Sequence, residues 1–376
     1  SERDMAAYVR FLLGRGTIDG KELLPRESIE RMERSESSLG SRLGLTVGYG
    51  LHLYRTADTT GFTWTGHGGA VEGGLSDVSY MPAYNVGYTF QINSGNHDAY
   101  DMIARLVRAY VTMGLTPPVP PPTAPISAAT RARFAGWYRS VSPRAQHLYP
   151  LERLAALVSA SFTGSTMRMK PILGAANTFV AVDSVRFRRL GEPEATLAFV
   201  RDDANGRPEG FEIFSTKLGT SAARVSAFDA VGTSAIAVLW VLGIALSCVA
   251  MVFGGLRRAV RRLRRMHSTR SVAAVAWRVA ALVALLVLTH FVLLAVGSGD
   301  VRVIGRFTLV SGSIWTAGIL FSLAALVGAV VAWRTPAAEG RWARLSLWTV
   351  RGVATLNVIV AAYLTYWGWI GWRTWM

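Results

Sequence analysis

The sequence is poor in cysteine, lysine and metal-ligand clusters. A single cysteine, Cys248, excludes an intrachain disulfide framework and a cysteine-rich metal site among the 376 residues. The 6 histidines are scattered, with no two at the spacing of metal ligands. We therefore expect neither a metal ion nor another cofactor.

Acidic residues are almost absent from the last third of the chain. Residues 257–376 contain 15 Arg, no Lys and two acidic residues, which gives +13 of the chain's net charge of +16. A basic excess is typical of nucleic-acid binding, but these arginines interrupt long apolar runs and form no patch on a soluble domain. We therefore expect no nucleic-acid partner. The hydrophobic share of 51% excludes a disordered chain, and the length favours two or three domains.

Four long runs without a charged residue lie in the same region. They contain 27, 21, 27 and 21 residues and are bounded by Asp229 and Arg257, Arg278 and Asp300, Arg306 and Arg334, and Arg351 and Arg373. A helix that rises about 1.5 Å per residue needs about 20 apolar residues to cross a bilayer. The runs predict an all-α region at 230–376 whose partner is the lipid bilayer. Its four transmembrane helices are expected at about 231–256, 272–297, 308–333 and 347–370.

The arginines between these helices are unevenly divided. Ten lie in the loops at 257–271 and 334–346, and three lie on the opposite side. The positive-inside rule therefore places both Arg-rich loops in the cytoplasm and residues 1–229 outside the cell membrane. Tryptophans crowd the outer end of the last predicted helix, as interfacial anchors do; they are Trp367, Trp369, Trp372 and Trp375.

Three ionisable residues fall within or beside the predicted spans. Arg278 and Arg351 lie near span ends, where a long side chain can reach the membrane surface. His290 is deeper and has no second titratable residue in the spans, which makes it a poor proton relay. We interpret it as a hydrogen-bonded histidine between helices.

The N-terminal part has an α+β pattern. Ser1 and Asp4 are placed to cap an amphipathic helix that starts at the first residue. Strand-like runs at 61–65, 75–81 and 86–92 follow, and 100–113 predicts a closing helix. Neither an initiating Met nor a signal peptide precedes this exported part, which predicts that the chain is the C-terminal portion of a longer protein.

The segment Gly66-His67-Gly68-Gly69-Ala70 contains residues that can do chemistry. Glycine lets the backbone approach a ligand closely, and a free N–H beside a histidine can stabilise an oxyanion or a carboxylate. A plain Gly-rich turn is the alternative interpretation.

A series of short motifs runs in order through residues 1–113: Asp4-Met5, Gly20, Leu23-Leu24, Ser28, Met32, Gly48-Tyr49-Gly50, Gly66 to Gly69, Tyr80-Met81-Pro82 and Asn93. The series resembles the C-terminal part of class C β-lactamase-like serine hydrolases, a group that includes penicillin-binding proteins, D-aminopeptidases and esterases. It implies a catalytic role for His67, substrate binding by Gly68 and Gly69, and an oxyanion-hole donor in the Ala70 N–H. Gly68 stands where the family more commonly has Ser or Thr.

The resemblance also implies a nucleophilic Ser followed by Lys at the third position, and the sequence has no such pair. Ser94-Gly95-Asn96 matches a Ser-x-Asn pattern, but it follows the Gly-rich segment where the family has this motif earlier, so we interpret it as a turn. We expect the missing groups upstream of Ser1 and the chain alone to be catalytically inactive.

Residues 116–126 contain six Pro and predict an extended spacer. Residues 127–229 predict a small, mainly-β domain with a helix near 151–158, strands at 178–188, 196–201 and 210–215, and a hairpin at Asn205-Gly206. Its opening, Phe134 to Arg139, resembles the lipocalin-like module appended to these hydrolases. Arg186, Arg188 and Arg189 favour a solvated strand edge over an anion site.

These features predict a multidomain protein. A partial β-lactamase/transpeptidase-like α+β fragment at 1–115 is followed by the linker, the mainly-β domain and the four-helix transmembrane region. The predicted function is that of a membrane-anchored, bacterial-type serine hydrolase acting through an acyl-enzyme on a small amide or ester, cell-wall peptides included. The alternative is a non-catalytic membrane protein whose exposed domain binds or senses a ligand, and a small transporter is disfavoured because the spans carry few polar groups.

Overall fold

The computed structural model describes residues 1–71, 73–143, 149–202, 208–214, 219–264, 272–297, 303, 305–336, 339–371 and 373. The chain divides into two compact units. Unit 1 comprises Ser1–Arg144 and Ala155–Ala230, and unit 2 comprises Ala145–Leu154 and Val231–Met376. The boundaries expected at 115, 126 and 229 remain predictions.

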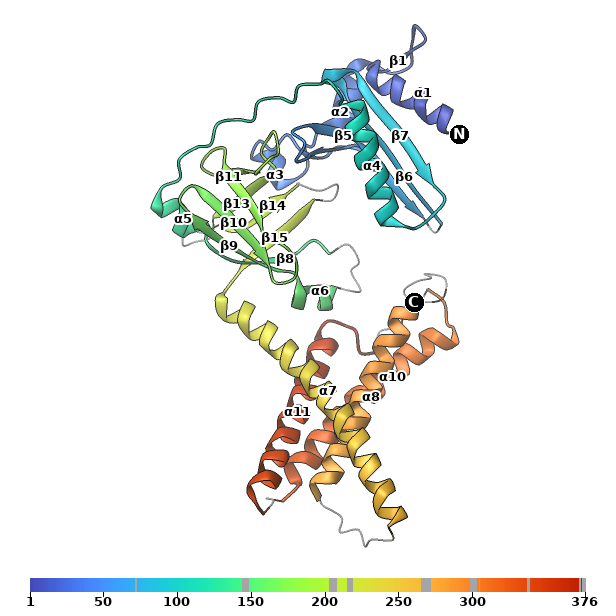
Figure 1. Ribbon diagram of the computed structural model, residues 1–376, viewed down its shortest axis with the longest axis vertical. Coiled ribbons are helices and arrows are strands. Elements are labelled where there is room, and N and C mark those ends of the chain that lie inside the picture. The colour runs from blue at the N-terminus through green and yellow to red at the C-terminus, as the bar shows by residue number, and fades with distance from the viewer. Residues whose placement is uncertain are drawn as a thin grey trace. The chain divides into compact units, whose positions relative to one another are not determined.

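Unit 1 begins with a five-stranded antiparallel sheet in the order β3-β4-β5-β6-β7 (Figure 1). Its strands are β3 (Gly48–Tyr49), β4 (Tyr54–Ala57), β5 (Thr63–Val71), β6 (Gly74–Met81) and β7 (Val86–Ile92). The predicted runs at 61–65, 75–81 and 86–92 are confirmed as strands. β5 continues to Val71, so the Gly-rich segment is strand and the turn interpretation is wrong.

The sheet has a helix on each face. α1 (Glu2–Leu13) buries Val9 and Leu12 against Val78 and Tyr80 of β6, whereas α4 (His97–Val111) covers the face with Trp64, Met81 and Tyr88. Side chains alternate between faces along a strand, which gives the one sheet two separate apolar cores. The predicted cap is present, because the Asp4 carboxylate accepts hydrogen bonds from the Ser1 amine at 2.8 Å and hydroxyl at 2.9 Å. Short elements complete this part: β1 (Thr17–Ile18), β2 (Lys21–Glu22), α2 (Arg26–Glu33), α3 (Leu39–Arg42) and η1 (Pro82–Tyr84).

The mainly-β prediction for the middle of the chain is confirmed as a closed, eight-stranded antiparallel barrel. After α5 (Ala128–Phe134) its strands are β8 (Gly136–Ser140), β9 (Leu157–Thr163), β10 (Thr166–Pro171), β11 (Asn177–Ala181), β12 (Arg186–Arg189), β13 (Leu197–Asp202), β14 (Pro208–Ile213) and β15 (Thr220–Val225). β15 pairs with β8 and closes the barrel. Aromatic rings fill the interior, with Phe134 and Phe199 stacked at a centroid distance of 4.2 Å. This barrel is therefore packed by its own side chains.

Several local predictions for this region need correction. The expected strand at 178–188 is two strands, β11 and β12, because the chain turns back at 182–185. Arg186, Arg188 and Arg189 lie on β12, which is paired on both sides, so the solvated-edge interpretation is wrong. The helix expected near 151–158 is α6 (Tyr149–Ala155), and Asn205-Gly206 lies outside the described residues.

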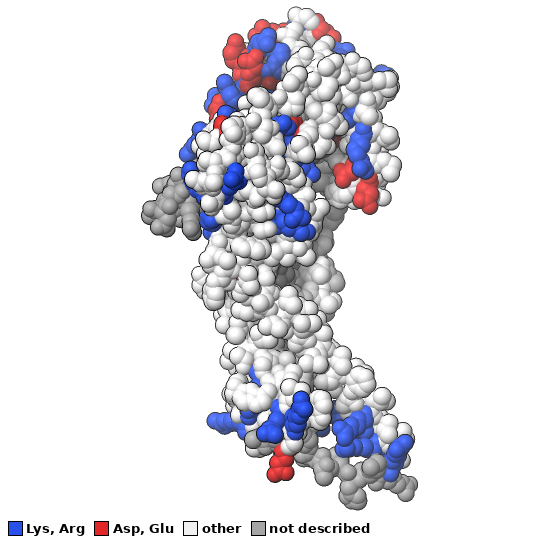
Figure 2. Space-filling model, turned by 60° about the vertical axis from the view of Figure 1, so that its left-hand side comes forward, with Lys and Arg blue, Asp and Glu red and all other residues white. Residues whose placement is uncertain are grey.

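The described residues of unit 2 include four helices that are long and apolar enough to cross a membrane, which is compatible with a multi-pass membrane protein in a lipid bilayer. They are α7 (Ala227–Leu263), α8 (Val272–Gly297), α10 (Leu309–Arg334) and α11 (Arg341–Tyr366). The fourth helix starts six residues before its predicted position, because the helix continues through Arg341 and Arg344. In Figure 2 the blue side chains of this unit gather at one end and a white band covers the rest of the visible face. The sidedness of this arrangement remains a prediction. Of the first Arg-rich loop expected at 257–271, residues 257–264 are described and residues 265–271 lie outside the described residues.

Buried polar side chains join the helices of unit 2. His290 of α8 is 2% exposed, and its Nδ1 lies 3.0 Å from the carbonyl oxygen of Ile314 on α10. A carbonyl only accepts, so Nδ1 carries the proton. The prediction of a hydrogen-bonded histidine between helices is confirmed. Trp240 Nε1 donates to Asn357 Oδ1 at 3.0 Å and joins α7 to α11 in the same way.

Two residues near span ends differ from the sequence interpretation. Arg351 of α11 donates to the carbonyl oxygens of Ala332 at 3.2 Å and Thr335 at 2.8 Å, so it caps the end of α10. Trp369 is 5% exposed and packs against the ring of His290, which makes it a core residue and not an interfacial anchor. Trp372 and Trp375 lie outside the described residues.

Candidate active site

The site residues predicted from the sequence lie on the part of β5 that extends beyond its pairing with β4. β4 begins at Tyr54, which pairs with Gly66 of β5. Residues 67–71 therefore continue without a strand on that side, as far as the described residues show, while their other side pairs with β6. The segment forms an open strand edge in the middle of the sheet.

The register decides which backbone groups face this open edge. Asp58 N–H donates to the Phe62 carbonyl oxygen at 3.0 Å and closes the β4–β5 hairpin. Hydrogen-bonded pairs in an antiparallel ladder recur at every second residue, so Gly66 directs its N–H toward β4. By the same alternation Gly68 and Ala70 direct their N–H groups to the same side, where they extend past the first residue of β4.

His67 is the titratable side chain on this segment, and it is exposed. Its Nε2 lies 2.5 Å from the hydroxyl oxygen of Tyr49 on β3. The ring of Tyr54 is 5.6 Å away and that of His52 is 6.3 Å away, nearly parallel to His67. His52 Nε2 in turn lies 3.2 Å from the hydroxyl of Tyr8 on α1. The four rings and Tyr8 form a connected aromatic cluster at the open edge.

The protonation of this cluster follows from its surroundings. Partial burial lowers the pKa of His52, and the neighbouring His67 lowers it further because two imidazolium charges would repel. Burial raises the pKa of the Tyr8 phenol, so Tyr8 keeps its proton at neutral pH while its hydroxyl lies within hydrogen-bond distance of His52 Nε2. His52 is therefore neutral at neutral pH.

The glycines of the segment differ in how strictly glycine is required. A Cβ on Gly66 would lie 2.0 Å from the backbone oxygen of Val78, so no other residue fits. A Cβ on Gly69 would lie 2.5 Å from the Ser76 hydroxyl, which a rotation of Ser76 relieves. At Gly68 the nearest atoms are the Tyr100 hydroxyl oxygen at 3.3 Å and the Ser76 backbone oxygen and Tyr54 hydroxyl oxygen at 3.5 Å, so a small side chain can be accommodated.

The Gly68 position lies above two tyrosine hydroxyls on the α4 face of the sheet. They belong to Tyr100 and Tyr54. Tyr54 is 5% exposed, and its buried hydroxyl has no hydrogen-bond partner among the described residues. Burial raises the pKa of both phenols, so both stay protonated at neutral pH. A hydroxyl at position 68 would find a partner here.

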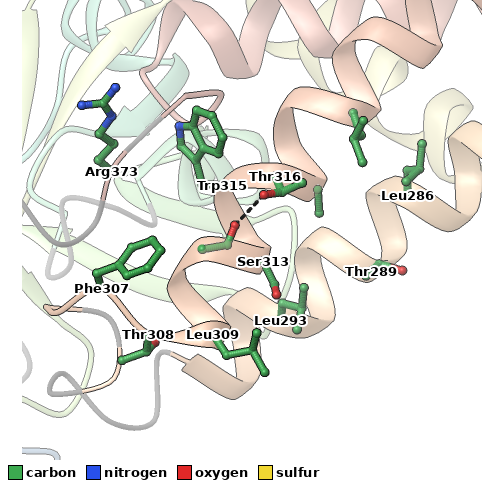
Figure 3. Close-up of a pocket in the computed structure, with 13 residues that line it drawn as sticks. Leu286, Thr289, Leu293, Phe307, Thr308, Leu309, Ser313, Trp315, Thr316 and Arg373 are labelled. Carbon is green, nitrogen blue, oxygen red and sulfur yellow. Dashed lines mark hydrogen bonds between the residues drawn. The ribbon is translucent and has the colours of Figure 1, made fainter.

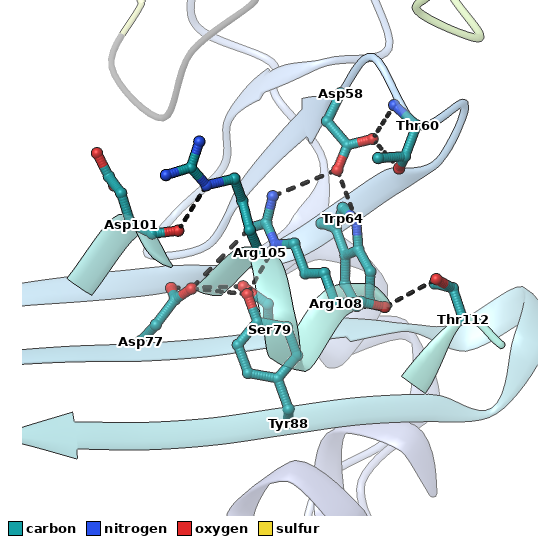
Figure 4. A network of polar contacts seen from close by, with 10 residues as sticks. All are labelled: Asp58, Thr60, Trp64, Asp77, Ser79, Tyr88, Asp101, Arg105, Arg108 and Thr112. Carbon is teal, nitrogen blue, oxygen red and sulfur yellow. Dashed lines mark hydrogen bonds and ion pairs between the residues drawn. The ribbon is translucent and has the colours of Figure 1, made fainter. Parts of the chain in front are cut away.

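A buried polar network lies between α4 and the face of the sheet that α4 covers (Figure 4). Asp77 of β6 pairs with Gly68, is fully buried and accepts a hydrogen bond from the Tyr88 hydroxyl at 2.8 Å. Arg108 of α4 donates to Tyr88 at 2.8 Å and contacts Asp58 at 3.4 Å. The network fixes α4 to the sheet beneath the open edge. The sequence analysis missed it, although an acidic residue at 77 inside an otherwise apolar strand was a signal.

A small hollow and the predicted turn at 94–96 lie near the Gly-rich segment. A hollow of about 250 Å³ is lined by Gly69, Ala70, Val71 and Gly74 together with residues of β6 and β7. Asn96 Oδ1 accepts from Ala99 N at 3.1 Å and caps α4, which confirms that Ser94-Gly95-Asn96 is the turn after the last strand. The structure thus brings together His67, the glycines and Ala70, and it adds Tyr49 and His52, which the sequence analysis did not assign to the site.

Comparison with known proteins gives weak structural likeness. No family model matches the chain, and no curated protein matches its sequence. A crystal structure of SurE is 21% identical with a TM-score of 0.33, and the match covers 60% of this chain and 48% of that one. SurE with D-Leu is 22% identical with a TM-score of 0.31, at 60% and 50% coverage. The octameric penicillin-binding protein homologue from Pyrococcus abyssi is 13% identical with a TM-score of 0.21, at 58% and 46% coverage. The chain spans about half the length of these structures, and the scores leave a β-lactamase-like fold unestablished.

Proposed function

We propose that residues 1–115 contribute the strand side of an acyl-transfer pocket in a membrane-anchored serine hydrolase of the β-lactamase and penicillin-binding-protein kind. The substrate class is a small amide or ester, with cell-wall peptides included. The observation that carries the proposal is the open edge of β5. There the N–H groups of Gly68 and Ala70 face the same open side of the strand, next to the exposed imidazole of His67.

The Ala70 N–H is suited to stabilise an oxyanion. When a nucleophile attacks the acyl carbon, the carbonyl oxygen becomes negatively charged, and a preorganised N–H lowers the energy of that state. An N–H at an open strand edge has no strand partner to release first. The Gly68 N–H and carbonyl, two residues earlier on the same edge, can hold the main chain of an extended substrate, and the missing side chain at Gly69 leaves room for it.

His67 is assigned to proton transfer or substrate orientation. Its Nε2 contact with Tyr49 fixes the ring, and its exposure gives it access to a bound substrate. In the acyl-transfer step a Ser Oγ–acyl bond forms, the amide or ester bond breaks, and the leaving group takes up the proton removed from the Ser hydroxyl. His67 belongs on the path of that proton.

The proposal requires a nucleophilic Ser and its Lys from outside the 376 residues, since the sequence contains no Ser followed by Lys at the third position. Without them no covalent intermediate forms. A fluorophosphonate or a fluorescent penicillin tests this requirement. We expect covalent labelling of the protein expressed from its own gene in native membranes, and none of the 376-residue chain. Labelling of the chain alone, or of neither protein, contradicts the proposal.

We further propose that residues 1–229 face the outside of the cell membrane, because the Arg-rich ends of α7, α10 and α11 would then lie in the cytoplasm. In a Cys248→Ser background, a membrane-impermeant maleimide should label Leu51→Cys, which is 66% exposed in the parent, in intact cells. It should label Arg261→Cys only after the cells are opened. The reverse pattern contradicts the orientation.

A non-catalytic binding function is the second candidate. The open edge of β5 also favours strand addition, in which an extended peptide pairs with the free N–H and carbonyl groups of a sheet. Under this alternative the native gene product binds peptide but is not labelled by either covalent reagent.

A further inference from the structure

A groove between two of the apolar helices of unit 2 has the character of a lipid site. It lies between α8 and the first half of α10, has a volume of about 920 Å³, and is shown in Figure 3. Its lining side chains are largely apolar; from α8 they include Leu286 and Leu293, and from α10 Leu309, Trp315 and Leu320. The volume lies within the range of about 300–1,000 Å³ of ligand sites.

Two of the four hydroxyl groups that line the groove, those of Thr308 and Thr316, form hydrogen bonds with the backbone of α10. Thr316 Oγ1 donates to the carbonyl oxygen of Gly312 at 2.8 Å, within its own helix, so its methyl group is what remains for a ligand. Thr308 uses its hydroxyl to cap the first turn of α10. The groove therefore matches a hydrocarbon chain better than a polar molecule. Leu309 is 89% and Leu320 46% exposed, so the groove opens toward the medium that surrounds the helices.

One end of the groove carries a positive charge. Arg373 lines it, in the segment that follows α11, and Thr308 precedes α10 at the same end of the lining. Both positions are outside the apolar helices, where a bilayer has its headgroups. Arg373 is exposed and forms no ion pair with any acidic side chain in the described part of the chain. An apolar groove with a cation at its headgroup end is complementary to an anionic lipid.

We propose that the α8–α10 groove binds a phospholipid with an anionic headgroup, with an acyl chain along α10 and the phosphate against Arg373. This site is independent of the acyl-transfer proposal, because all of its residues belong to unit 2. A single arginine near a membrane surface contributes about fivefold in affinity for an anionic lipid.

The test is lipid retention by the full 376-residue chain in detergent, measured by native mass spectrometry with dioleoylphosphatidylglycerol and dioleoylphosphatidylcholine. We expect preferential retention of the anionic lipid and an approximately fivefold loss in Arg373→Gln. Arg334→Gln is the matched control, since it removes the same charge from the opposite end of α10, and it should retain lipid like the parent. Ser313→Trp, which places a bulky ring in the groove, should reduce retention of both lipids.

A second measurement does not depend on the folding of any variant. A phosphatidylglycerol with a photoreactive acyl chain should crosslink the parent chain at residues 286–293 or 309–320. Equal retention of the two lipids, an unchanged affinity in Arg373→Gln, or crosslinks confined to other helices would each overturn the proposal.

Discussion

Tyr49 and His67 lie on different strands, β3 and β5, and the tyrosine hydroxyl oxygen is 2.5 Å from the imidazole Nε2. β4 lies between the two strands in the sheet but begins only at Tyr54, so nothing from β4 separates the side chains beyond that residue. The contact therefore marks the place where the sheet opens, and it fixes the ring of the proposed catalytic histidine.

Replacing these two residues should affect the acyl-transfer activity of the native gene product to different degrees. His67→Ala removes the proposed proton-transfer group and is expected to lower kcat about 10²–10⁴-fold. Tyr49→Phe removes one hydrogen bond to a ring that stays in place, and a loss of about 2–10-fold is expected. The rate of acylation by a fluorescent penicillin measures both. Rates equal to the parent in His67→Ala would remove His67 from the mechanism.

Gly66 and Gly68 provide a matched pair for testing how strictly each position of β5 requires glycine. Gly66→Ala drives a methyl group into the backbone of β6 and should reduce the stability of unit 1 by more than about 2 kcal/mol. Gly68→Ala brings its methyl group no closer than 3.3 Å to any neighbouring atom and should change stability by less than about 1 kcal/mol. Thermal unfolding of the detergent-solubilised chain distinguishes them, and equal effects would contradict the register.

Glu192 should make the barrel less stable at neutral pH than at acidic pH. Its side chain is fully buried, Thr196 Oγ1 donates to its Oε2 at 2.6 Å, and burial raises the pKa of Glu192 to about 7 from an ordinary value of 4.5. The folded chain therefore holds an extra proton between about pH 4.5 and 7, so the free energy of unfolding falls as pH rises through that window.

Glu192→Gln keeps a neutral side chain at every pH. It should match the parent below pH 4.5 and be more stable above pH 7, by about 2–3 kcal/mol as an order of magnitude. Amide-exchange protection factors of β12 and β13 between pH 5 and 8 measure the difference. A gap that does not change with pH would mean that Glu192 is ionised in the folded chain.

Arg351 should stabilise the helical unit through its specific geometry and not through charge alone. Its guanidinium caps the end of α10 and lies 5.3 and 5.1 Å from the ring centroids of Trp333 and Trp348. Arg351→Ala should lower the stability in detergent by about 1–3 kcal/mol, and Arg351→Lys should recover only part of it because an ammonium cannot reproduce the planar contacts. Arg344→Ala, at an exposed arginine of the same helix, is the control and should have no measurable effect.

The four long apolar helices were largely predictable from the sequence, whereas the closure of the mainly-β domain into a barrel was not. Soluble helices rarely stay free of charge for more than about 20 residues, so the four runs predicted all four helices. β10 was missed because its residues have low strand propensity, although Met167 and Met169 point inward while Arg168 and Lys170 point outward. Closure depends on the pairing of β15 with β8, two segments that lie far apart in the sequence.

The site was predicted in part. Glycine spacing and the family resemblance indicated residues 67–70, but the open edge depends on where β4 begins, which propensity does not specify. Tyr49 on β3 and His52 between β3 and β4 lie beside His67 through the pairing of the strands, which the sequence pattern did not specify. His290 was interpreted correctly, since a lone buried histidine needs a hydrogen bond.

The central claim is that the Ala70 N–H at the open edge of β5 stabilises the oxyanion of acyl transfer. Proline is tolerated at a strand position whose N–H faces away from any neighbouring strand, so Ala70→Pro removes this donor with little expected loss of fold, and Ala70→Gly is the control that keeps it. In the native gene product we expect Ala70→Pro to lower the rate of acylation by about 10²–10³-fold while Ala70→Gly stays near the parent. Acylation by a correctly folded Ala70→Pro protein at the parental rate would contradict the account.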